Sequence, residues 1–193
     1  MTQPMPDFAA ARRAMIDSQL RPQGVSDPAV LAGMGGVPRE QFVPEAARAA
    51  AYFDRPVDLG EGKALMPPAA LGRLIMELEP RPGERALVVG PGNGYATKVL
   101  EQLDLTVDSA ESHQAVGKAI YDLILIDGAV EEVPAGLVAR LSPGGRLGTA
   151  IADNGVTRLA IGRVSNGILG LRRFADAEVP VLSAFTRPRV FTF

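Results

Sequence analysis

The spacing of apolar residues predicts helices through the first eighty residues. Asp7 can cap a helix whose apolar side chains recur along one face until Arg21 and Pro22 stop the run. Ser26 or Asp27 then begins a shorter helix that ends at a glycine pair. The chain therefore opens with helices that have one apolar face to bury.

Helical spacing continues to the middle of the chain. An Ala-rich helix is expected near residues 45–52, and residues 56–66 are expected to form a loop. The most regular helical pattern begins at Pro67 and Pro68 and ends at the prolines and glycine of residues 80–83. Its apolar stripe consists of Leu71, Leu74, Ile75 and Leu78.

The period changes after residue 83, where short apolar runs indicate strands. Residues 86–89 and 121–126 are continuous apolar runs, which are typical of strands covered on both faces. A glycine loop and a helix follow the first of them, as at the opening of an α/β nucleotide-type fold. A helix is expected over 134–141. Antiparallel strands are expected at residues 146–151, 157–165 and 168–175 and at the C-terminal RVFTF.

Composition restricts the chemistry. The chain has 193 residues, of which 47% are hydrophobic, with a formal net charge of −2, one histidine and no cysteine. The absence of cysteine excludes thiol nucleophiles, disulfides and cysteine-ligated metal sites. We expect no metal site. His113 could serve a Ser-His-Asp arrangement, but no GxSxG-like turn accompanies it, so a surface role is the simpler interpretation.

Charge and hydropathy also limit the expected partners. The sequence pI of about 5.5 argues against binding to a nucleic-acid backbone, which needs clustered basic residues. No stretch approaches the roughly 20 apolar residues of a membrane span, and the N-terminus lacks the pattern of a signal peptide. We therefore expect a cytoplasmic protein with neither nucleic acid nor membrane as partner.

The glycine loop after the first strand is the best candidate for a ligand site. Gly90, Gly92 and Gly94 place backbone N–H groups at the start of a helix. The loop lacks the Gly-Lys-Ser/Thr ending of a P-loop, and Tyr95 stands where a dinucleotide fingerprint has its third glycine. A GxGxG loop suits S-adenosylmethionine, with Glu111, about 20 positions downstream, on the ribose hydroxyls. Another nucleotide-type ligand and a purely structural turn are the alternatives.

Three stretches, in order, resemble a known family. The segments are VPREQFVP at residues 37–44, VVGPGNGYATKVL around the glycine loop, and YDLILIDGAVEEVPAGLVARLSPGGRL from residue 121. Together with the helical segment before VPREQFVP, they resemble protein-L-isoaspartate O-methyltransferases over most of the chain. The resemblance implies methyl transfer from S-adenosylmethionine to a carboxylate of isomerised aspartate in damaged proteins.

The resemblance also implies a fold and a site. The fold would be a Rossmann-like class I methyltransferase sheet in one domain over residues 1–193, helical over 1–82 and with the sheet over 83–193. The cofactor would lie on the glycine loop and two acidic residues. The implied residues are Gly90, Pro91, Gly92, Asn93, Gly94, Tyr95, Glu111 and Asp127. Asp127 precedes a glycine at a strand end, so a simple turn is the competing interpretation.

The chain departs from the family pattern in the substrate loop. Ala64, Leu65 and Met66 are the expected substrate-lining residues, but Ala64 and Met66 stand where the family has hydroxyl side chains. Neither can donate a hydrogen bond to a carboxylate. A methyltransferase with another acceptor, or a relative that only binds partners, is therefore the alternative.

The second departure is the short connection between Glu111 and Tyr121. The family has a helix, a strand and another helix there, whereas this chain has only residues 112–120. A parallel crossover normally needs about a dozen residues. Glu111 therefore has two interpretations, as a ribose ligand after a strand or as the third residue of a capping box that begins at Asp108. With either one, the adenine side of the pocket should be unusually open.

Overall fold

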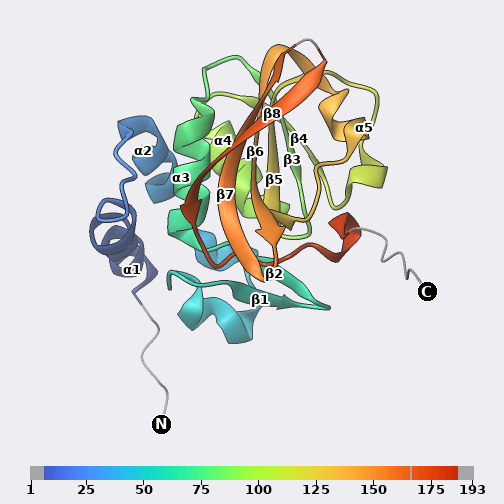
Figure 1. Ribbon diagram of the computed structural model, residues 1–193. Coiled ribbons are helices and arrows are strands. Elements are labelled where there is room, and N and C mark those ends of the chain that lie inside the picture. Colours follow the sequence, from blue (N-terminus) through green and yellow to red (C-terminus); the bar gives the residue numbers. More distant parts are fainter. Residues whose placement is uncertain (1–6, 166, 187–193) are drawn as a thin grey trace, which may run out of the picture.

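The computed structural model describes residues 7–165 and 167–186. A six-stranded sheet lies at its centre (Figure 1). The helices are α1 Phe8–Met15, α2 Pro28–Gly36, α3 Pro68–Leu78, α4 Asn93–Glu101 and α5 Ala135–Val138. A π-helical turn, η1 Ile16–Leu20, extends α1, and the 3₁₀ turns are η2 Arg39–Phe42, η3 Glu45–Ala50, η4 His113–Ala115 and η5 Ser183–Phe185. The strands are β1 Val57–Gly60, β2 Lys63–Leu65, β3 Arg85–Val89, β4 Thr106–Ala110, β5 Tyr121–Val130, β6 Leu141–Asp153, β7 Val156–Ser165 and β8 Ile168–Asp176.

The sheet has the order β4-β3-β5-β6-β7-β8, in which the first four strands pair in parallel and β7 pairs antiparallel with both β6 and β8. Strand β3 is covered on both faces, as its apolar sequence predicts, because Ala86 and Val88 face one core cluster and Leu87 and Val89 face another. The α/β architecture with an antiparallel last third is confirmed.

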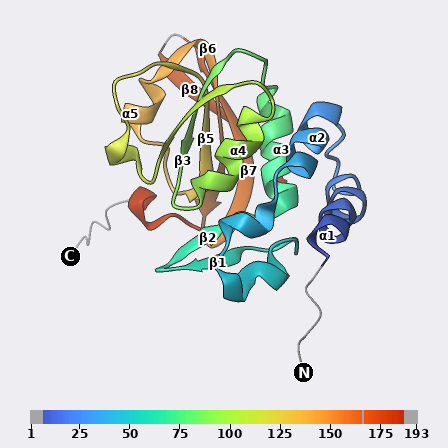
Figure 2. The same cartoon turned by 180° about the vertical axis from the view of Figure 1, so that it is seen from behind.

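Helices cover one face of the sheet. Figures 1 and 2 show α3 and α4 against the strands, with α2 and α1 outside them. The predicted stripe of α3 is fully buried, and Asp7 and Asp27 cap α1 and α2 as expected, each accepting a backbone N–H. One core cluster joins residues of the N-terminal helices, α3, α4 and the sheet.

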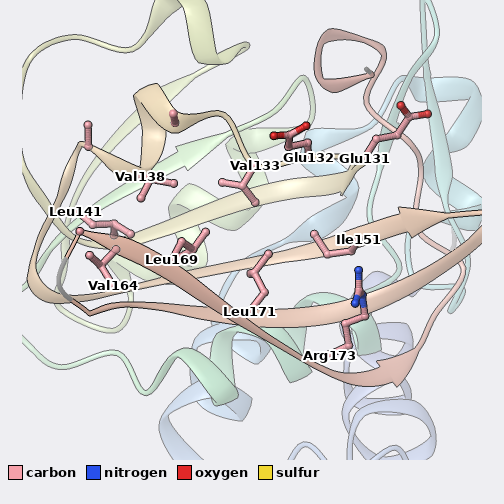
Figure 3. Close-up of a pocket in the computed structure, with 13 residues that line it drawn as sticks. Glu131, Glu132, Val133, Val138, Leu141, Ile151, Val164, Leu169, Leu171 and Arg173 are labelled. Carbon is pink, nitrogen blue, oxygen red and sulfur yellow. The ribbon is translucent and has the colours of Figure 1, made fainter. Parts of the chain in front are cut away.

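The opposite face is covered much more thinly. The helix predicted over residues 134–141 is reduced to the four residues of α5. Between α5 and strands β6 to β8 an open groove of about 670 Å³ exposes the apolar side chains of Val138, Leu169 and Leu171 (Figure 3). The C-terminal stretch through η5 covers another part of this face, where Leu182 and Phe185 join its core cluster.

The connection from β4 to β5 is as short as the sequence predicts. Residues 111–120 cross from the carboxyl end of β4 to the start of β5 on the far side of β3, with only η4 as regular structure. Among the described residues, no strand besides β3 pairs with β4, which is the edge of the sheet. The adenine side of the expected pocket therefore lies at an open sheet edge.

Two predicted elements are wrong. Residues 56–66 form the antiparallel hairpin β1–β2 in place of a loop, and the Ala-rich segment at 45–50 is the 3₁₀ turn η3. The predicted strand RVFTF lies outside the described residues. Within the part of the chain that the structure describes, no helix is both long and apolar enough to cross a membrane.

Candidate functional site

The glycine loop lies where the carboxyl end of β3 meets the start of α4. The Gly90 N–H donates to the carbonyl of Ala110 in the neighbouring strand, at 2.9 Å. Gly90 has φ +151°, and a Cβ there would lie 2.9 Å from the carbonyl oxygen of Asp127. A Cβ on Gly92 would lie 3.1 Å from the carbonyl oxygen of Ala64. The glycines thus let this loop pack backbone to backbone against β5 and the hairpin.

A cavity of about 250 Å³ opens beside this loop at the carboxyl edge of β3 and β4. Its walls come from the tip of the β1–β2 hairpin, the glycine loop, the start of the crossover and the C-terminal stretch before and through η5. The lining residues are Glu61, Gly62, Lys63, Ala64, Pro91, Glu111, Ser112 and residues 180–185. Ligands of α/β folds bind at this edge of the sheet, so the cavity is the candidate cofactor site.

The structure separates the predicted site residues into two groups. Pro91, Glu111 and Ala64 line the cavity. Leu65 and Met66 are 1% exposed and belong to the core. Of the three expected substrate-lining residues, only Ala64 therefore lines the cavity.

Two further loop residues, Tyr95 and Gly94, lie against Phe42. Tyr95 is buried with its ring edge-on to Phe42, 5.8 Å between centroids, so its side chain is a packing element and not a cavity wall. A Cβ on Gly94 would meet the same Phe42 ring at 3.2 Å. Asn93 begins α4, but its side chain lies outside what the structure describes.

Glu111 stands at the rim of the cavity. Because β4 continues through Ala110 and Asp108 lies within it, the capping-box interpretation is wrong. The Asp108 carboxylate instead pairs with Arg85, at 2.7 Å, and accepts from the Tyr121 hydroxyl. The Glu111 side chain is 74% exposed, and its Oε2 lies 3.6 Å from Nζ of Lys63. An exposed carboxylate directly after β4 is the arrangement that a ribose ligand requires.

Asp127 is buried deeper than a cofactor ligand at the cavity wall would be. It is 2% exposed at the carboxyl end of β5, and neither carboxylate oxygen has a hydrogen-bond partner among the described residues. Burial raises the pKa of Asp127 to about 7, against the opposing influence of the Arg39 guanidinium. The side chain therefore lies behind the glycine loop, on the side of the N-terminal region.

Arg39 is the residue that the sequence did not reveal. It comes from VPREQFVP and is completely buried, where its Nε donates to the Ala51 carbonyl at 2.6 Å and Nη2 to the Met66 carbonyl at 2.5 Å. Its guanidinium also stacks 4.7 Å from the centroid of the Tyr95 ring. Arg39 thereby fastens the end of the hairpin segment to the core behind the glycine loop.

No histidine is among the described residues that line the cavity. The His113 ring, just outside it, packs on Phe185 with 4.8 Å between centroids, so it is half-buried and not a free surface side chain. Among the described residues, no group of three or more His, Cys, Asp or Glu side chains could hold a metal ion. The cavity wall offers two exposed carboxylates, of Glu61 and Glu111, and the Lys63 ammonium, which suit binding and positioning.

Comparisons with known proteins identify the family of this chain. A family model described as protein-L-isoaspartate(D-aspartate) O-methyltransferase matches residues 10–117. A protein-L-isoaspartate O-methyltransferase of Methylorubrum extorquens is 35% identical over 94% of this chain and 92% of its own length. One from Rhodopseudomonas palustris is 32% identical over 91% of this chain and 84% of its own length.

Solved structures agree in fold. A Plasmodium falciparum structure, described as a protein-L-isoaspartate O-methyltransferase in complex with S-adenosyl-L-homocysteine, superposes with a TM-score of 0.71 at 22% identity, covering 90% of this chain and 98% of that one. At 22% identity the structural similarity shows the fold alone. The family is shown by the sequence matches. The chain belongs to the protein-L-isoaspartate(D-aspartate) O-methyltransferase family.

Proposed function

We propose that this chain transfers a methyl group from S-adenosylmethionine to the carboxylate of isoaspartyl residues in proteins or peptides. The observation that carries the proposal is the glycine loop, with Glu111 and the cavity beside it at the carboxyl edge of β3 and β4, in a chain of this family. The cytoplasm is the proposed compartment, in keeping with a chain without cysteine.

The residues present fit such a donor. Gly90 and Gly92 let the loop pack closely on β5 and the hairpin, and Pro91 between them lines the cavity. Glu111 supplies the acceptor oxygens for a pair of ribose hydroxyls. When bound, the donor supplies an activated methyl group, which the carboxylate oxygen accepts as the carbon–sulfur bond breaks with its electron pair left on sulfur.

The chain's own contribution is orientation and exclusion of water. A carboxylate is already ionised near neutral pH, so the reaction needs no general base. The hairpin tip and the segment at 180–185 enclose the space in front of the glycine loop, where an in-line approach can be held. A site with one ammonium and two exposed carboxylates is sufficient for this chemistry.

Methylation of a synthetic peptide tests the proposal. The purified protein is incubated with S-adenosylmethionine labelled in the methyl group and a peptide that contains one isoaspartyl residue. We expect a base-labile methyl ester on this peptide and none on the same peptide with ordinary aspartate. If S-adenosylhomocysteine binds but neither peptide is esterified, the acceptor is a different group.

The Glu111→Ala variant tests the cofactor side separately. Loss of two ribose hydrogen bonds to a charged acceptor should weaken S-adenosylhomocysteine binding by about 10-fold or more. Because Glu111 is exposed, the melting temperature should not change. Unchanged affinity in calorimetric titration would remove Glu111 from the cofactor site.

A further inference from the structure

The tip of the β1–β2 hairpin carries the basic side chain nearest the candidate cofactor cavity. Lys63 is the first residue of β2 and pairs across the hairpin with Gly60. The next residue, Ala64, brings its carbonyl oxygen to within 3.1 Å of where a Cβ on Gly92 would lie. The backbone of Lys63 is therefore held in a fixed place above the glycine loop.

The Lys63 side chain turns toward the cavity. Its Nζ lies 3.6 Å from Oε2 of Glu111 and 3.9 Å from Oε2 of Glu61. The side chain is 35% exposed, and among the described residues that line the cavity it is the one with a positive charge. Its ammonium thus spans the rim between the hairpin and the carboxyl end of β4.

The same loop lacks other donors for an acceptor carboxylate. Ala64 has no polar side-chain atom, and Met66 is in the core with its carbonyl already bound by Arg39. Ser112 and Ser183 also line the cavity with hydroxyl donors, but among the described lining residues the Lys63 ammonium is the donor with a positive charge. An ammonium offers three donors and a full charge, which is more than a pair of hydroxyls.

We propose that Lys63 binds the acceptor carboxylate in this chain and positions it for methyl transfer. The proposal rests on the proposed isoaspartyl methylation and names the residue that recognises its substrate. In the free protein Lys63 is paired with Glu111. When ribose hydroxyls occupy Glu111, the ammonium exchanges this partner for the incoming carboxylate. The exchange is easy, because an exposed ion pair contributes little to stability.

This exchange implies an order of binding. The cavity of about 250 Å³ lies below the range of 300–1,000 Å³ that is usual for drug-sized ligands, and the Lys63–Glu111 contact spans its rim. The cofactor opens that contact and frees the ammonium, so acceptor binding follows cofactor binding. The donor has a carboxylate of its own besides its positive sulfur, so the Kd of the cofactor has to be measured beside the KM of the acceptor.

Steady-state kinetics of Lys63→Met and Lys63→Arg test the proposal, with Lys98→Met as the matched control. Lys98 is another exposed lysine in an ion pair, 2.6 Å from Glu101 on α4, and does not line the cavity. We expect Lys63→Met to raise the KM for an isoaspartyl peptide by about 10-fold or more, since one charge-assisted interaction is lost. Lys63→Arg should retain most of the affinity, and Lys98→Met should behave as the wild type.

Cofactor binding supplies the second measurement. The Kd of S-adenosylhomocysteine should be unchanged or tighter in Lys63→Met, because Glu111 is freed. A Kd weakened in step with KM would make Lys63 a cofactor ligand and overturn the proposal. An unchanged KM would overturn it too, while isoaspartyl methylation itself stands. If the wild type forms no base-labile ester, the proposed function fails and the role of Lys63 fails with it.

Discussion

The two faces of the central sheet are built very differently. On one face, α3 and α4 pack on the strands, and the N-terminal helices pack on them in turn (Figures 1 and 2). On the other face, the cover that the described residues supply consists of the four-residue α5, the crossover at 111–120 and the C-terminal stretch through η5. The first face has two layers of helix outside the sheet, and the second leaves the groove of Figure 3 open.

The difference between the two faces means that one face supports the candidate site and the other gives access to it. The helical face holds the site from behind, where Arg39 fastens the hairpin segment and Tyr95 packs under the glycine loop. The thin face supplies Leu182 and Phe185 to the cavity wall. Regions with few buried contacts open most readily. We therefore expect the cavity to open on the thin side while the helical side stays fixed.

The largest expected effect is on the helical face. Leu74 lies at the centre of α3 and is completely buried. Leu74→Ala should lower the free energy of unfolding by about 3–5 kcal/mol, because the double layer of helix cannot collapse into the cavity that the change leaves. Chemical denaturation measures the loss. A loss below about 1 kcal/mol would show that this face is as loosely packed as the other.

A slightly smaller effect concerns the buried carboxyl behind the glycine loop. Because burial raises the pKa of Asp127 to about 7, the folded state holds its proton more tightly than the unfolded state does. Stability from this group is full below about pH 4 and is lost as pH rises toward 7. The shift from 3.8 corresponds to at most about 4 kcal/mol.

The Asp127→Asn variant isolates that effect, since the amide keeps the shape without the charge. Between pH 4 and pH 8, the free energy of unfolding should fall with rising pH in the wild type. In the variant this fall should be absent. Asp108 and Asp122 have lowered pKa values, from their hydrogen bonds to Arg85 and other neighbours, so they act below this window. Parallel curves for the two proteins would mean that Asp127 is not buried as a lone carboxyl.

On the thin face, Gly128 tests how firmly the C-terminal stretch is attached. A Cβ on Gly128 would lie 2.5 Å from Cγ of Leu182, and the backbone of Leu182 donates to the Ala129 carbonyl at 2.8 Å. Gly128→Ala should lower the free energy of unfolding by about 1–3 kcal/mol, as overpacking does. It should also weaken S-adenosylhomocysteine binding, since Leu182 lines the cavity. Unchanged affinity with lowered stability would separate the stretch from the site.

The sequence predicted the elements that carry a long regular pattern. The sequence predicted the stripe of α3, the apolar runs of β3 and β5 and the glycine turn into α4. In these elements the spacing of apolar residues along the chain directly reflects which positions are buried. The hairpin β1–β2 was missed because strands this short have no pattern of their own. Its place depends on packing of Ala64 against Gly92, which is remote in sequence.

The polar part of the site was harder to predict. The position of Glu111 after a strand was expected, and the structure removes the capping alternative. Arg39 is buried because three segments supply its neighbours, the carbonyls of Ala51 and Met66 and the ring of Tyr95. Such a set of partners has no signature at fixed spacing. Lys63 could not be predicted either, because its proposed role depends on its distance from Glu111, which the sequence does not give.

The smallest expected effect is at the open groove. Leu171 is 39% exposed on the edge strand β8 and lines the groove between α5 and the sheet. Leu171→Thr keeps a residue that suits a strand, so the free energy of unfolding should change by no more than about 0.5 kcal/mol. The contrast with Leu74→Ala, a change of similar kind on the opposite face, then measures the difference between the two faces directly. A loss above about 2 kcal/mol would mean that the groove is covered in solution, and the faces would be more alike than their helices indicate.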